Sequence, residues 1–323
     1  MDSSTSAQET YFMKKYMSNK LAILLFVLPA FLLFTTFIFV PIVQVFLYSF
    51  TEWNGVKQAT FIGLENYIRL FRDSDFIVAN KNQLIFAVLI TVYQMGLATI
   101  FAIAVSDPKL KGRKFLRIAY FIPVVLSVTV VCQLWLAVLN PNNGLLNTFL
   151  RTIGSDYQQK WLSERYRAIY VVAFVNAWQW MGYQFALIVA GVKTISADYY
   201  EAAKIDGAST VQSHFRITIP LLRETYKFCL VISVTGGIKA FTEMFIMTKG
   251  GPGTATYTLT YMMYSSAFRG KEYGYGLSAA VIMVLECFMG MLVINYLLRD
   301  RDEDGKMVKK NKKKAIGRKE SAS

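Results

Sequence analysis

The 323-residue sequence is poor in charged residues, histidine and cysteine. Charged side chains make up 17% of the chain, whereas soluble globular proteins carry about 25%. There is one histidine, and the three cysteines (Cys132, Cys229 and Cys287) lie in apolar segments without a Cys or His partner at metal-ligand spacing. The pattern argues against a disulfide framework and a metal centre, and we expect no cofactor.

A phosphate-binding loop is also missing. The chain contains no G-x-x-x-x-G-K-[ST] motif, and the glycine-rich stretch 250–254 lacks the lysine and the hydroxyl residue that complete such a loop. That stretch is better explained as a tight turn at the end of a helix. We therefore expect that the chain does not bind ATP in this way and is not itself an enzyme.

The chain is rich in long runs of apolar residues. Hydrophobic residues make up 54% of it, and a helix needs about 20 mostly apolar residues to cross a bilayer. We predict an all-α integral membrane protein with six transmembrane helices. The first is longer than a bilayer requires and contains Pro29 and Pro41, so we expect a kink or an interfacial extension there. The six runs are Leu21–Phe50, Gln83–Ser106, Ile118–Asn140, Ala168–Val192, Phe228–Thr248 and Leu277–Leu298.

The net charge of +14 is distributed unevenly along the chain. Ten of the 35 Lys and Arg residues lie in 299–323, and five more lie in 107–117. Basic residues that flank membrane spans mark the cytoplasmic side, so no nucleic-acid partner is implied. We predict a multi-pass protein of the bacterial cytoplasmic membrane with both termini cytoplasmic: an N-terminal segment 1–20, a six-helix domain 21–298 and a basic tail 299–323.

The segment 193–227, between the fourth and fifth predicted spans, then also lies in the cytoplasm. Ser196 is a favourable N-cap for a helix that reaches Ile205, and Gly207 interrupts this helix as a left-handed cap or a bend. A second helical stretch is predicted for Ser209–Thr218. Such a short amphipathic helix pair outside the bilayer is suited to docking into a groove of a soluble partner.

The helix pair resembles the EAA coupling loop of permeases from ATP-binding-cassette (ABC) importers. The sequence `EAAKIDGAST`, followed by `ITIPLL`, matches the family pattern at Glu201, Ala202, Ala203, Asp206, Gly207, Phe215, Ile219 and Pro220. The resemblance implies the fold of a type I ABC importer transmembrane domain. It also implies that Glu201–Gly207 form a coupling helix that sits in a cleft of an ATPase subunit, where Gly207 permits close approach.

Further stretches narrow the resemblance. `FIGLENYIRLF` (61–71), `FIPVVLS` (121–127) and `TKGGPGTATYTL` (248–259) are similar to carbohydrate-uptake permeases, in particular to the larger maltose permease subunit type. This type pairs with a second, unlike permease. The resemblance also implies two ATP-binding-cassette ATPase subunits, an extracytoplasmic solute-binding protein and a sugar as the transported solute.

Polar and aromatic residues inside the predicted spans mark a candidate solute pathway. In the fourth span, a cluster within nine residues comprises Asn176, Trp178, Trp180, Tyr183 and Gln184. Aromatic platforms beside amides suit sugars, although an aromatic belt with ordinary helix packing explains the fourth-span residues equally well. By resemblance, Asn176 and Ser233 match sugar-lining positions, whereas Trp180 and Lys239 depart from the maltose type, so the expected solute is not maltose. The candidates are Asn176, Trp178 and Trp180 in the fourth span, and Ser233, Lys239 and Glu243 in the fifth.

Charged residues in the spans leave alternatives open. Lys239 and Glu243 are four residues apart and could pair on one helix face, or line the pathway, where Lys239 would suit an anionic solute such as glycerol phosphate. Glu286 either hydrogen-bonds across helices or stays protonated. An ion-coupled secondary transporter would use Lys239, Glu243 and Glu286 as a relay, but such folds generally contain internal repeats, and we find none.

Overall fold

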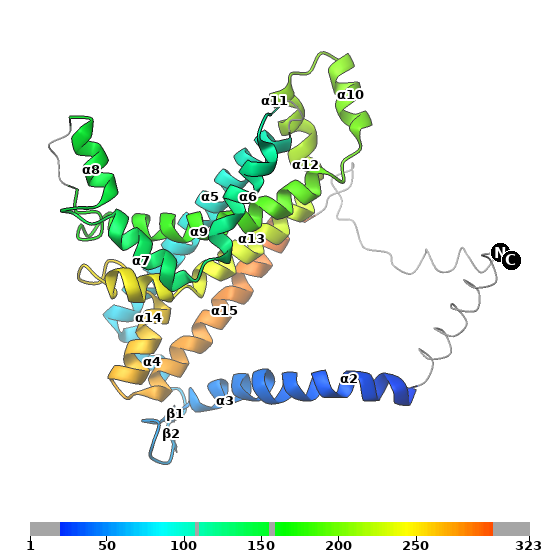
Figure 1. Ribbon diagram of the computed structural model, residues 1–323. Helices are drawn as coiled ribbons and strands as arrows, with labels where there is room; N and C mark the ends of the chain where they lie inside the picture. The colour runs from blue at the N-terminus through cyan, green and yellow to red at the C-terminus, as the bar shows by residue number, and fades with distance from the viewer. Residues whose placement is uncertain (1–19, 107–109, 155–158, 300–323) are drawn as a thin grey trace. The chain divides into compact units, whose positions relative to one another are not determined.

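The computed structural model describes residues 20–106, 110–154 and 159–299, which divide into two compact units. The first unit comprises residues 20–72 together with Met263–Val281, and the second comprises Asp73–Met262 together with residues 282–299. Both units are built almost entirely from helices (Figure 1). The predicted N-terminal segment 1–20 and tail 299–323 lie almost wholly outside the described residues.

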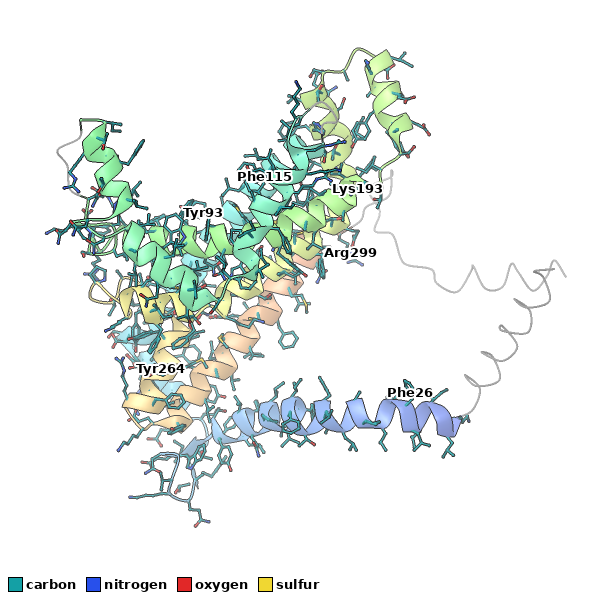
Figure 2. The ribbon with its side chains drawn as sticks, in the orientation of Figure 1. Phe26, Tyr93, Phe115, Lys193, Tyr264 and Arg299 are labelled. Carbon is teal, nitrogen blue, oxygen red and sulfur yellow. The ribbon has the colours of Figure 1, made fainter. Side chains whose placement is uncertain are left out.

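The first unit begins with a long apolar helix. Between Pro29 and Pro41 this helix changes to π-helical winding, a local irregularity at the place where a kink was predicted. Most of its described side chains are exposed, as Phe26 illustrates with 91% of its surface free (Figure 2). The unit contains α2 (Lys20–Phe34), η1 (Thr35–Phe39), α3 (Val40–Tyr48), β1 (Thr51–Glu52), β2 (Thr60–Phe61), α4 (Glu65–Arg72) and η4 (Ser265–Arg269).

A small polar and aromatic hub holds the first unit together. The strands β1 and β2 pair in antiparallel fashion, and the carbonyl oxygen of Trp53 accepts hydrogen bonds from the backbone N–H groups of Tyr273 and Gly274. The guanidinium of Arg69 donates two hydrogen bonds to Glu272, at 2.8 and 3.1 Å. The hub therefore ties the segment after α3 to the start of α15.

The second unit contains the main helix bundle. Helix α9 packs against α5, α6 and α13, and Figure 1 shows α8 at one end of α9 and α10 at the other. The elements are α5 (Ser74–Ser106), α6 (Arg113–Val125), α7 (Val128–Val138), α8 (Leu145–Thr152), α9 (Ala168–Val192), α10 (Ala197–Ile205), α11 (Thr210–Ser213), η2 (His214–Thr218), α12 (Ile219–Leu221), α13 (Arg223–Ile238) and η3 (Met244–Thr248). Helices α14 (Leu259–Tyr264) and α15 (Tyr273–Leu297) contribute residues to both units.

Among the described residues, three helices are long and apolar enough to cross a membrane: Ile23–Tyr48, Ser74–Ser106 and Tyr273–Leu297. A fourth span results if α6 and α7, which are bent by 105°, count as one. Polar residues lower the hydropathy of α9, and α13 is only 16 residues long. The fold is therefore a helical membrane fold, and the number of six spans stays a prediction.

One predicted span is wrong as a continuous helix. Helix α13 ends at Ile238, and regular winding resumes only at Thr242, just before η3. The backbone hydrogen bonds at the break are those of a helix end, because the N–H groups of Lys239 and Ala240 turn back to the carbonyls of Thr235 and Gly237. The predicted run Phe228–Thr248 is thus two helical pieces joined by a non-helical turn.

Glycines set the closest helix contacts in the second unit. A Cβ atom placed on Gly237 of α13 would lie 2.6 Å from Cα of Ala87 in α5. A Cβ atom on Gly182 of α9 would lie 2.3 Å from the carbonyl oxygen of Tyr120 in α6. Small residues allow the backbones of neighbouring membrane helices to touch, so α5, α6, α9 and α13 form one tightly packed group.

Candidate functional site

A cavity of about 350 Å³ lies inside the second unit, between α5, α9, α13 and the turn that follows α13. Five of the six predicted pathway residues line it: Asn176, Trp180, Ser233, Lys239 and Glu243. Tyr183 and Gln184 of the fourth-span cluster also line it, together with Gln94, which the prediction did not include. The volume is at the lower end of the range for small-molecule sites, about 300–1,000 Å³.

Trp178, the sixth predicted pathway residue, is not among the residues that line this cavity. Its ring meets Trp135 of α7 edge to face, with 5.6 Å between the ring centroids. It packs against the apolar cluster that contains Val131, Val175 and Met244. The structure therefore places Trp178 in a packing position and brings the other five residues together.

The cavity occupies a polar layer between two apolar clusters. Along α5, Ile90 belongs to the first cluster and Ala98 to the second, while Gln94 lies between them. Helix α9 shows the same order, with Ala173 in the first cluster and Phe185 in the second. The packed layers on both sides fix the helices that carry the polar side chains.

Four hydrogen bonds connect five side chains across this layer into what we call the polar chain. Gln184 Nε2 donates to Ser233 Oγ at 2.9 Å, and Ser233 Oγ donates to Gln94 Oε1 at 2.8 Å. Gln94 Nε2 donates to Asn176 Oδ1 at 3.2 Å, and Asn176 Nδ2 donates to Glu243 Oε1 at 2.5 Å. All five residues are at most 5% exposed. The chain therefore ties α5, α9 and α13 to the residue that precedes η3.

The predicted pairing of Lys239 with Glu243 on one helix face is wrong. The prediction assumed a continuous helix, but α13 ends at Ile238 and Lys239 is its C-cap. The carboxylate of Glu243 instead accepts a hydrogen bond from Asn176. In the part of the chain that the structure describes, no ion pair joins Lys239 to Glu243. Lys239 is exposed and lines the cavity.

The carboxylate of Glu286 takes the first of its two predicted options. Its Oε1 accepts a hydrogen bond from Asn80 Nδ2, and its Oε2 accepts one from Gln83 Nε2 at 2.7 Å. Both donors lie on α5, so the bonds cross from one helix to another. Glu286 is not among the residues that line the cavity.

The predicted helix pair is present and is exposed. Ser196 caps α10 by accepting a hydrogen bond from the N–H of Asp198. At the other end Gly207 has φ +76°, and the N–H of Ala208 bonds to the carbonyl of Ala203, as in a Schellman motif. The motif residues Glu201, Ala202, Asp206 and Gly207 are exposed, and Ala203 is half-buried. Apart from Gly207 and its two chain neighbours, no atom of the residues that the structure describes lies within 4 Å of a Cβ placed on Gly207.

Gln94 is a polar-chain residue that the sequence prediction left out, whereas Gln184 belongs to the predicted fourth-span cluster but not to the candidate list. Gln94 lies within the second predicted span, so the available signal was a lone amide in the middle of an apolar helix. Gln184 lies eight residues after Asn176 on α9, and both line the cavity. Such spacing places two side chains on nearly the same helix face.

Residues 13–302 match the protein family described as binding-protein-dependent transport system inner membrane component. The chain belongs to this family. It is 35% identical over 289 residues to the probable ABC transporter permease protein YurN of Bacillus subtilis, which covers 88% of this chain and 99% of that one. It is 29% identical over 263 residues to the diacetylchitobiose uptake system permease protein NgcF of Streptomyces coelicolor, with 78% and 74% covered.

The fold agrees with this assignment. A chain in the crystal structure of a bacterial ABC transporter involved in the import of the acidic polysaccharide alginate superposes with a TM-score of 0.77. The match covers 88% of the present permease and 98% of that chain at 23% sequence identity. The protein is thus a membrane permease of the ABC transporter type, similar to the carbohydrate-uptake permeases as the sequence motifs predict.

Proposed function

We propose that this permease is one of two unlike transmembrane subunits that together form the import pathway for a sugar or an oligosaccharide. An extracytoplasmic binding protein delivers the solute, and two ATPase subunits supply the energy. The observation that carries the proposal is the cavity between α5, α9 and α13, because it combines amides and a lysine with the rings of Trp180, Tyr183 and Phe241. Apolar rings beside hydrogen-bonding groups suit the two kinds of surface that a sugar presents.

The helix pair of residues 196–221 is proposed to couple ATP hydrolysis to this cavity. It connects the C-terminal end of α9 directly to the N-terminal end of α13, and both helices line the cavity. Exposed Ile205 and Phe215 give the helix pair apolar contact surface for a partner. A displacement of α10 by an ATPase would reach both walls of the cavity through short connections. With six spans, the helix pair and both termini lie in the cytoplasm.

The test uses the purified complete transporter in proteoliposomes, with Trp180→Ala compared to Trp178→Ala. ATP hydrolysis and uptake are measured with diacetylchitobiose, maltotriose and arabinotriose, and the best of these sugars is kept as the probe. Trp180 lines the cavity and Trp178 does not. Trp180→Ala should raise the KM for the probe about fivefold, the effect of losing a ring contact of about 1 kcal/mol.

The control isolates packing from solute contact. Trp178→Ala should lower the melting temperature of the complex and leave the KM unchanged, because its ring packs on Trp135. Equal KM values for the wild type and Trp180→Ala would contradict the proposed cavity. Sugar uptake that continues without ATP hydrolysis would favour the ion-coupled secondary transporter instead.

A second candidate solute is an acidic one, such as glycerol phosphate or an acidic sugar. The specific observation is that Lys239 lines the cavity while Glu243 is held by Asn176. The ammonium of Lys239 can therefore meet an anionic group without first breaking an ion pair to Glu243. The structurally similar transporter imports an acidic polysaccharide, which supports this candidate.

A further inference from the structure

Helix α10 is held to the rest of the permease at few points. Every residue of α10 is exposed except Tyr200 and Ala203, which are half-buried. At its C-terminal end the chain turns at Gly207, where φ is +76°. A helix that is exposed along most of its length can tilt without moving its neighbours, unless a side chain links it to them.

The hydroxyl of Tyr200 provides such a link. It shares a hydrogen bond of 2.8 Å with the hydroxyl of Thr218, the last residue of η2. Nδ1 of His214 lies 3.1 Å from the same Thr218 oxygen, and the ring of His214 lies beside that of Tyr200. A hydroxyl donates one hydrogen bond and can also accept, so Thr218 can bind both neighbours at once. We call Tyr200, His214 and Thr218 the hydroxyl link.

The winding of η2 brings two members of the hydroxyl link together. His214 and Thr218 are the first and last residues of a single π-helical turn, in which the N–H of Ile219 bonds to the carbonyl of His214. Such turns are rare and occur frequently at functional sites. Thr218 is 1% exposed, so water does not readily replace a partner that its hydroxyl loses.

Thr218 lies where two cavity-lining helices meet. Its carbonyl oxygen accepts a hydrogen bond from the N–H of Leu222, the N-cap of α13. Leu222 is 3% exposed and belongs to the second apolar cluster together with Phe185 of α9. A Cβ atom on Gly191, in the last turn of α9, would lie 2.8 Å from the side chain of Leu222. A force on Thr218 therefore acts on the first turn of α13 and on the last turn of α9.

Resting on the proposed function, we propose that Tyr200 is the positioning residue that couples α10 to α13, and that it acts through Thr218 and His214. Tyr200 and Thr218 are 18 positions apart in the chain, and the Gly207 turn lies between them. Rotation at this turn would absorb a displacement of α10 by the ATPase. The hydrogen bond bypasses the turn, so α10 and η2 move together and the displacement reaches the cavity.

The experiment measures sugar uptake and ATP hydrolysis by the complete transporter in proteoliposomes, with the sugar of the panel above that the wild type transports best. Tyr200→Phe keeps the ring and removes the hydroxyl. We expect the number of sugar molecules transported per ATP to fall about three- to tenfold, the range for one lost hydrogen bond. A variant that is merely less stable loses both activities in proportion and keeps this ratio. An unchanged ratio would overturn the proposal.

Tyr199→Phe is the matched control. Tyr199 is the neighbouring residue of α10, is 55% exposed, and its hydroxyl has no hydrogen bond within the described part of the chain. The ratio of sugar to ATP should stay at the wild-type value. A fall as large as that in Tyr200→Phe would show that the loss of any hydroxyl from α10 uncouples the transporter, and would overturn the proposal.

Two variants of Thr218 test the link from its other end. Thr218→Val keeps the shape of the side chain without the hydroxyl, and should lower the ratio by a factor similar to Tyr200→Phe. Thr218→Ser keeps the hydroxyl and should retain most of the wild-type ratio. Tyr200→Phe combined with Thr218→Val should lower the ratio no further, because both changes remove one contact. Factors that multiply, or a Thr218→Ser variant as uncoupled as Thr218→Val, would overturn the proposal.

A reporter thiol separates failure of the link from failure of the sugar function. Gly236 of α13 lines the cavity, and apart from adjoining residues of its own helix no described atom lies within 4 Å of a Cβ placed on it. Gly236→Cys is made with Cys287→Ser, since Cys132 and Cys229 are buried.

If the wild type transports no sugar of the panel, the proposed sugar function fails, and the labelling of this reporter still tests the link. ATP should change the rate at which a water-soluble maleimide labels the reporter, and Tyr200→Phe should remove most of that change. A change of equal size with and without Tyr200→Phe, or no change in either, would overturn the proposed coupling.

Discussion

The helix pair is held by hydrogen bonds between residues that are close in the sequence, whereas the polar chain is held by hydrogen bonds between residues that are far apart in it. In the helix pair the caps join neighbours: Ser196 binds the N–H of Asp198, and Ser209 exchanges two hydrogen bonds with Gln212. In the polar chain the partners are 49 to 139 residues apart in the sequence. The caps of the helix pair therefore depend on neighbouring residues alone, whereas the cavity exists only when the whole bundle is assembled. Substitutions at these caps should therefore affect that segment alone, whereas substitutions in the polar chain should affect the packing of the whole bundle.

The largest effect is expected at Gly207, where Gly207→Leu should lower uptake by at least about thirtyfold. A leucine side chain would fill space that is open in this chain and that the proposed ATPase partner occupies. The loss corresponds to about 2 kcal/mol, the value of a central interface contact. Uptake and membrane insertion are measured on the same cells, and insertion should stay normal.

The control for this substitution is Gly112→Leu. Gly112 has φ +80°, and as at Gly207 no atom of the described residues, apart from the glycine and its two chain neighbours, lies within 4 Å of the point that a Cβ atom would occupy. Both variants force a leucine into the left-handed region at a cost of about 1–2 kcal/mol, but only Gly207 lies in the helix pair. Gly112→Leu should keep most of the uptake. Wild-type transport by Gly207→Leu would show that the coupling assignment is wrong.

A smaller effect is expected at Lys239, where Lys239→Met distinguishes the two candidate solutes. For an acidic probe such as glycerol 3-phosphate the KM should rise about tenfold, the effect of losing a charge-assisted hydrogen bond of about 1.5 kcal/mol. For a neutral sugar the rise should be about threefold. Radiolabelled uptake in proteoliposomes measures both.

Two comparisons sharpen the result at Lys239. Lys193→Met removes a lysine just after α9 (labelled in Figure 2) that is not among the residues lining the cavity, and should leave both KM values unchanged. Full recovery of transport when Glu243→Gln is added to Lys239→Met would mean that the two residues act as a charge pair. That outcome would contradict the separate roles that the structure gives them.

The smallest effect is expected from the caps of the helix pair. Ser209→Ala removes the side chain that accepts from the N–H of Gln212, and should lower the local stability of α11 and η2 by about 1 kcal/mol. Ser127 is the N-cap of α7 but makes no side-chain cap hydrogen bond, so Ser127→Ala should change little. Amide hydrogen exchange measures both. Equal exchange rates in Ser209→Ala and the wild type would show that the helix pair is held by more than its caps.

The range of the interactions also explains how much of the molecule could be predicted. The cap at Ser196 and the left-handed residue at Gly207 follow from local chemistry and are confirmed. The presence of long apolar helices follows from composition. The break after Ile238 was not predicted from the apolar run Phe228–Thr248. Gly236, Gly237 and Lys239 stand at the break and are typical of a helix end, but glycine is also common where membrane helices pack closely, so the residue types alone do not decide between the two.

The candidate site was predictable only in part for the same reason. Helical spacing placed Asn176 and Trp180 on one face, and the family resemblance pointed to Asn176 and Ser233. The structure brings all three to one cavity. The contribution of Gln94 depends on the approach of α5 to α13, which no local pattern records. The error at Lys239 and Glu243 came from applying helical spacing across a turn.

The close contact between Gly237 and Ala87 sets the distance between α13 and α5 in the polar layer, and this distance can hardly change without breaking hydrogen bonds. Gly237 lies one helical turn beyond Ser233, and there the gap between α13 and α5 is too narrow for a methyl group. Serine has a side chain of only two heavy atoms, so Ser233 reaches Gln94 only because the helices are this close. A methyl group at position 237 would push α13 away from α5. It would therefore lengthen the hydrogen bond between Ser233 and Gln94, although it contacts neither residue. The hydrogen bond between Ser233 and Gln94 thus depends on the absence of a side chain at Gly237.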